Sequence, residues 1–110
     1  MANTFKNAVS SAIGTGQTSV YTVPSATTST VIGLTVSNIT GSDITVDVVV
    51  TDTSASASVH IIKGATVPVG GAVVPIGGDQ KVVLEATDIL KVTSSASSSA
   101  DALVSVLEQT

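Results

Sequence analysis

The sequence predicts an all-β fold, a single β-sandwich of about eight short antiparallel strands. The apolar residues of the 110-residue chain are mostly β-branched, with nineteen Val and eight Ile against five Leu, and sixteen Thr accompany them. Such side chains fit a pleated sheet better than a helix. Apolar and polar residues alternate with period 2, and turn residues interrupt this alternation about every eight to twelve residues, which is typical of a sandwich. The length allows one core.

The first sixteen residues stand apart from the rest of the chain. Their periodicity is weak and their polarity is mixed, so we expect residues 1–16 to form either an N-terminal arm or a first strand. Residues 17–110 are expected to form the sandwich domain. Its first clear strand covers 18–23, and Pro24 ends it because proline has no N–H for the ladder of a central strand.

Two strongly alternating segments follow, at 31–38 and 44–52. In the first segment, the alternation places Ile32 on the same face as Leu34. The link at 39–43 contains Thr, Gly, Ser and Asp, which favour turns. We therefore predict that the two segments form a hairpin.

The second half of the chain contains shorter segments of the same kind. We expect Gly64 to end one strand, and Gly33, inside a strand, to mark a bulge or a close backbone approach. The Ser-rich stretch 94–101 is predicted to be a flexible loop. This pattern fits a jelly roll and an immunoglobulin-like sandwich equally well. The remaining predicted strands are 57–63, 65–69, 72–76, 81–85, 89–93 and 102–108.

Composition argues against several classes of function. The net charge is −4 and the four lysines are scattered, whereas binding to nucleic acid or to an anionic membrane requires clustered cations. The absence of cysteine removes disulfides, thiolate nucleophiles and cysteine-bound zinc. The first residues lack the apolar stretch of a secretory signal and no apolar run is long enough to span a membrane, so we expect synthesis and folding in a cytoplasm.

Candidate catalytic residues are few. His60 is the single histidine, and its strand position predicts a solvated side chain without a nucleophile–base pair. The aspartates lie mostly at turns, where they usually cap the backbone, although loops of a sandwich can also gather a calcium site. No helix follows the glycine pairs to form a phosphate cradle. One Phe and one Tyr offer little of the aromatic platform of a glycan site. We expect a protein that is not an enzyme, with no cofactor and no catalytic or metal-binding residues.

Three stretches taken together resemble small virion structural proteins of tailed bacteriophages, especially marine and cyanobacterial phages. They are MANTFKNA at 1–8, VYTVPSATTSTVIGL at 20–34 and GGDQKVVLEATDILKV at 77–92. Thr87 stands where such modules often carry Gly, a departure that concerns the turn type. The resemblance implies a capsid decoration (cement) protein on the outer head surface of the virion, or else a neck or tail component.

The partners implied are the major capsid protein and further copies of this chain, with no nucleic acid and no membrane. Binding in many symmetric copies lets modest contacts add up. The candidate docking arm consists of Ala2, Asn3, Thr4, Phe5 and Lys6, with Phe5 either its anchor or a core residue. The alternatives are a fibre component and a glycan- or receptor-binding sandwich module.

Overall fold

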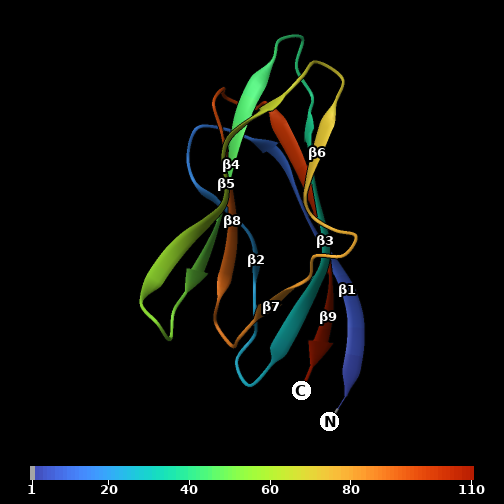
Figure 1. Ribbon diagram of the computed structural model, residues 1–110, viewed down its shortest axis with the longest axis vertical. Helices are drawn as coiled ribbons and strands as arrows, with labels where there is room; N and C mark the ends of the chain where they lie inside the picture. Colours follow the sequence, from blue (N-terminus) through green and yellow to red (C-terminus); the bar gives the residue numbers. More distant parts are fainter. Residues whose placement is uncertain (1) are drawn as a thin grey trace.

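The computed structural model describes residues 2–110, which form two antiparallel sheets packed face to face (Figure 1). The prediction of an all-β sandwich is confirmed. Within residues 2–110, no helix is long and apolar enough to cross a membrane. The strands are β1 (Asn3–Ile13), β2 (Thr18–Thr22), β3 (Thr28–Asn38), β4 (Ile44–Asp52), β5 (Ala57–Val67), β6 (Ala72–Ile76), β7 (Val82–Leu84), β8 (Ile89–Ser94) and β9 (Ala100–Gln109).

The strand order is that of a jelly roll. One sheet has the order β1-β9-β3-β6, with β7 also paired to β3, and the other has the order β2-β8-β4-β5. Strands therefore pair from the chain ends inward, β1 with β9, β2 with β8, β3 with β6 and β4 with β5, as in a long hairpin rolled into a sandwich. The two ends of the described chain, Ala2 and Thr110, consequently lie side by side at one end of the sandwich (Figure 1).

The fully buried core between the sheets consists of aliphatic side chains, mostly Val, and the partly buried Tyr21 packs against it. Because successive strand residues point to opposite faces, each strand contributes every second residue to this core. In β4 the inward residues are those predicted from the sequence, Ile44, Val46, Val48 and Val50, and all four are buried. Val31, Leu34, Leu90 and Val104 are fully buried opposite or beside them.

The predicted hairpin of β3 with β4 is wrong, because these two strands lie in different sheets. Asn38, at the end of β3, holds the crossover between the sheets. Its Nδ2 donates to the backbone oxygens of Ser42 (2.8 Å) and Val67 (3.0 Å), and its Oδ1 accepts from the backbone N of Thr40 (2.8 Å). Alternation in a sequence shows which residues share a face of a strand, but it does not show which strand pairs with which. A short link can therefore lead either to a neighbouring strand of the same sheet or to a strand of the other sheet.

Two strand glycines behave differently from each other. A bulge between Val31 and Gly33 confirms the predicted irregularity, and its extra residue turns Ile32 outward while Val31 and Leu34 both point into the core. The expected shared face of Ile32 and Leu34 is therefore wrong. Gly64 does not end a strand, because β5 continues through it with φ +68°, and its N–H donates to the Asp47 carboxylate at 2.7 Å.

The N-terminal segment belongs to the sandwich. Of the two alternatives for residues 1–16, the structure has the strand, since Asn3–Ile13 form β1 and pair with β9 at the edge of the larger sheet. The stretch 94–101, predicted as a flexible loop, contains only a short link, because β8 ends at Ser94 and β9 begins at Ala100. Hydrogen bonds hold this link in place. Ser99 is buried and bonds through its hydroxyl to the backbone oxygen of Ala96 (2.7 Å).

Candidate docking face

The outward face of the larger sheet carries rows of apolar side chains that run across its strands. In one row the strand register aligns Phe5 of β1 with Leu107 of β9, then Thr30 of β3 and Val83 of β7. Phe5 is 74% exposed, so it is not the core residue that was one alternative for it, and Val83 is exposed as well. Cross-strand neighbours of this kind are close enough to present a continuous surface.

A second row crosses the same sheet nearer its other end. Val9 of β1 is aligned with Leu103 of β9 and then with Thr35 of β3, and both apolar residues are exposed. A shallow hollow lies here, lined by Val9, Thr35 and Leu103 together with Asp101 and neighbouring small residues. We call the outward side chains of this sheet the docking face; its apolar members are Phe5, Val9, Ile32, Val74, Val83, Leu103 and Leu107.

The docking face is almost uncharged. Of the outward positions in the described strands of this sheet, Asp101 alone is ionisable, and its Oδ1 accepts from the backbone N of Ala12 at 2.9 Å. The outward side of the smaller sheet differs, since Lys91 and Asp47 lie on it, together with His60 opposite Val49. The outer face of the larger sheet therefore suits contact with another protein, and that of the smaller sheet suits contact with water.

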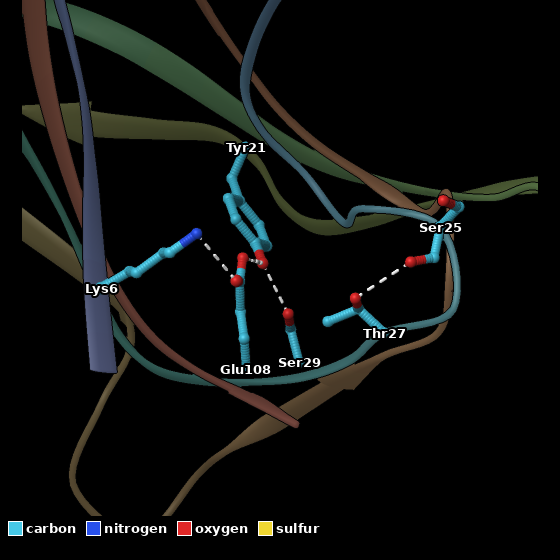
Figure 2. A network of polar contacts seen from close by, with 6 residues as sticks. All are labelled: Lys6, Tyr21, Ser25, Thr27, Ser29 and Glu108. Atoms are coloured by element: carbon cyan, nitrogen blue, oxygen red, sulfur yellow. Dashed lines mark hydrogen bonds and ion pairs between the residues drawn. The ribbon is translucent and has the colours of Figure 1, made fainter. Parts of the chain in front are cut away.

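A polar network closes the sandwich at the end where the termini meet (Figure 2). Tyr21 of β2 donates its hydroxyl proton to Glu108 Oε2 of β9 at 2.6 Å, and Lys6 Nζ of β1 lies 3.0 Å from Glu108 Oε1. Because the Tyr21 proton is directed at the carboxylate, Ser29 of β3 donates to the Tyr21 oxygen at 2.5 Å. The network thus connects the smaller sheet to three strands of the larger one.

The protonation states of this network follow from its surroundings. Burial, reinforced by the hydrogen bond to Glu108, raises the pKa of Tyr21 to about 12, so the phenol remains neutral. The hydrogen bond from Tyr21, followed by the ion pair with Lys6, lowers the pKa of Glu108 against the opposing effect of its burial. Glu108 is therefore a buried carboxylate whose charge is balanced.

Three carboxylates meet where the end of β4 lies beside the turn between β7 and β8. Asp52, Glu85 and Asp88 can each place an oxygen within 4.8 Å of the others, which is the kind of gathering that a loop calcium site needs. Asp88 is the buried carboxylate of the three, and backbone N–H groups satisfy it, because it accepts hydrogen bonds from Thr53 N (3.2 Å) and Glu85 N (2.9 Å). The Ser54 hydroxyl and the Ala55 N–H bond to Asp52 and lower its pKa. These bonds match the expected capping role.

The candidate docking residues lie along the first strand and not on an arm. Ala2 exchanges backbone hydrogen bonds with Thr110, and Asn3, Thr4, Phe5 and Lys6 follow in β1. Phe5 contributes to the docking face, whereas Lys6 points to the polar network. His60 is exposed, as predicted.

Most of the docking face does not follow from the sequence pattern. The alternation places Leu103, Leu107 and Val83 in strands and predicts no role for them. The available signal is that β9 carries apolar residues at both alternating positions, which indicates that both faces of a strand are covered. No protein-family model matches the chain, and no curated protein matches it.

Proposed function

We propose that this chain is a structural protein of a phage virion, a capsid decoration (cement) protein that binds the outer head surface and stabilises the shell by non-covalent contacts between coat subunits. The observation that carries the proposal is the docking face, a nearly uncharged sheet surface on which apolar side chains are exposed in rows. Exposed patches of this kind mark protein–protein contacts. In this proposal the docking face lies on the major capsid protein, and the polar outer face of the other sheet meets solvent.

Two further considerations support this proposal. The jelly-roll order occurs in many viral capsid domains, which is an analogy at the level of the fold and says nothing by itself about the site. The resemblance of three stretches to phage virion proteins points the same way. The docking face also lacks Arg, Trp and Tyr, the usual residues of strong single contacts, so binding depends on many copies that act together.

The alternatives receive less support from the site. A glycan platform would need exposed aromatic rings, but the Tyr21 hydroxyl is bonded to Glu108 between the sheets and leaves Phe5 as the exposed ring. A neck or tail position would use the same docking face, and it differs from decoration in the number of copies.

The number of copies on purified phage particles tests the proposal. Quantitative mass spectrometry, with the major capsid protein as the internal reference, should find hundreds of copies per head, as a shell-wide lattice requires. A mild chaotrope should remove the chain while the heads stay closed, and the stripped heads should release DNA at a lower temperature. A count of a dozen or fewer would contradict decoration and indicate the neck or tail, and absence from the particles would contradict any virion role.

A further inference from the structure

The four sheet edges of the sandwich differ in how well they are protected against pairing with another strand. The edge strand β2 has five residues and an irregular register between Ser19 and Tyr21. The edge strand β5 is interrupted by two register shifts and by Gly64. The β6–β7 edge consists of two short strands and contains Pro75. Short strands, bulges and prolines are common protections of sheet edges.

The edge strand β1 has none of these protections over most of its length. From Asn3 to Ser10 it pairs with β9 in one unbroken register, and this segment contains neither Gly nor Pro. The single charge on it, Lys6, is paired with Glu108 at 3.0 Å and points toward the sandwich. An edge of this length is a template for a further strand.

The hydrogen-bond phase of β1 determines which residues the open edge presents. The Ala2 N donates to the Thr110 oxygen and the Thr110 N donates to the Ala2 oxygen, so these two residues form a hydrogen-bonded pair. Bonded and non-bonded pairs alternate along an antiparallel ladder, so the even-numbered residues face β9. The backbone groups of the odd-numbered residues, Asn3, Phe5, Asn7 and Val9, point to the open edge.

We propose that β1 pairs antiparallel with β1 of a second copy of this chain, across a two-fold axis at Asn7. This register is one of three that join odd-numbered residues near the middle of the strand. An axis at Lys6 would place Lys6 opposite its own copy, which like charges disfavour. An axis at Ala8 would place Phe5 opposite Ser11. The axis at Asn7 places Phe5 opposite Val9, a favourable aromatic–aliphatic pair, and Lys6 opposite Ala8.

The same register joins the apolar rows of the two molecules. Leu107 is aligned with Phe5 in one copy, and Val9 is aligned with Leu103 in the other, so four apolar side chains form one row across the junction. The two sheets become one continuous sheet whose docking face is doubled in area. Because both copies use the same edge, the pairing closes at two chains and leaves no β1 edge open.

This inference does not depend on the proposed function, because the dimer would form in solution without any particle. The chain contains no cysteine, so a single introduced cysteine can form a disulfide only with the same cysteine of a second copy. The matched variants are Asn7→Cys and Asn3→Cys, two asparagines with exposed side chains on the same strand whose backbone groups point to the same edge. With the axis at Asn7, the two Cα atoms at position 7 lie about 5.5 Å apart, within disulfide range. Those at position 3 lie about 27 Å apart.

The purified full chain should sediment as a dimer, and mild oxidation should cross-link Asn7→Cys roughly tenfold more than Asn3→Cys. Both variants should keep the β-sheet circular dichroism of the wild type. A monomer at all concentrations would overturn the inference. A dimer that cross-links equally at both positions, or at neither, would also overturn it, because another edge or register would then join the copies.

Discussion

Glu108 shows how a single residue joins the two sheets. Its carboxylate accepts a hydrogen bond from the Tyr21 hydroxyl and forms an ion pair with Lys6, and these contacts lower the pKa of the carboxyl. A carboxylate with a lowered folded-state pKa stabilises the fold above the unfolded-state pKa. This stabilisation is lost as the pH falls through the folded-state value.

The predicted consequence is a specific acid sensitivity. Between about pH 5 and pH 2, the free energy of unfolding should fall more steeply for the wild type than for Glu108→Gln, so the two curves should converge at low pH. The control is Glu85→Gln, which changes the other glutamate, exposed and outside the network. Urea unfolding at a series of pH values measures both. Equal slopes for Glu108→Gln and Glu85→Gln would show that the network does not contribute.

Asn38 has its effect at the scale of the elements. It lies where β3 of the larger sheet turns into β4 of the smaller one, and its side-chain amide bonds to backbone groups on both sides of the crossover. Its removal leaves the buried carbonyl of Val67 without this donor, and it also removes the bonds to the backbone of Thr40 and Ser42, which costs free energy.

We expect Asn38→Ala to lower the free energy of unfolding by about 1–3 kcal/mol. The matched change Asn7→Ala, at an exposed asparagine of β1, should alter it by less than about 0.5 kcal/mol. Chemical denaturation of the two variants, at a concentration low enough to keep the chains monomeric, measures the difference. If both variants lost the same stability, the crossover would not depend on this amide.

The elements also show how far the sequence predicts the fold. The inward residues of β4 and the exposed position of His60 follow from period-2 alternation alone, since both are local properties. Pairing between strands does not follow from it, so the hairpin predicted at the link after Asn38 is wrong and a crossover to the other sheet stands there. A bulge next to Gly33 reversed the face of Ile32, because one extra residue changes the alternation.

The candidate site was predictable only in part for the same reason. The sequence predicts Phe5 as an anchor, but the row that it shares with Leu107 and Val83 exists only once β1, β9, β3 and β7 lie side by side. These strands are distant in the sequence, and their register is a property of the folded chain.

At the scale of the whole molecule, the two outer faces divide the surface by chemistry. The larger sheet presents the docking face, with Asp101 as its one ionisable outward residue among those described, and the smaller sheet presents charged and polar side chains. If the docking face lies on the coat shell, a charge placed in it becomes buried without a partner, which is strongly unfavourable. The same charge on the other sheet stays in water.

The rebinding of two matched variants to stripped phage heads tests this account most directly. Val83→Asp changes a 64% exposed valine of β7 in the docking face, away from the β1 edge, and Val59→Asp changes a 58% exposed valine of β5 in the other sheet, opposite Val50 and outside the docking face. Binding of Val83→Asp should weaken by about tenfold or more, and it should fail to restore heat resistance, while Val59→Asp should bind like the wild type. Equal binding of both variants, or loss with Val59→Asp alone, would contradict the account.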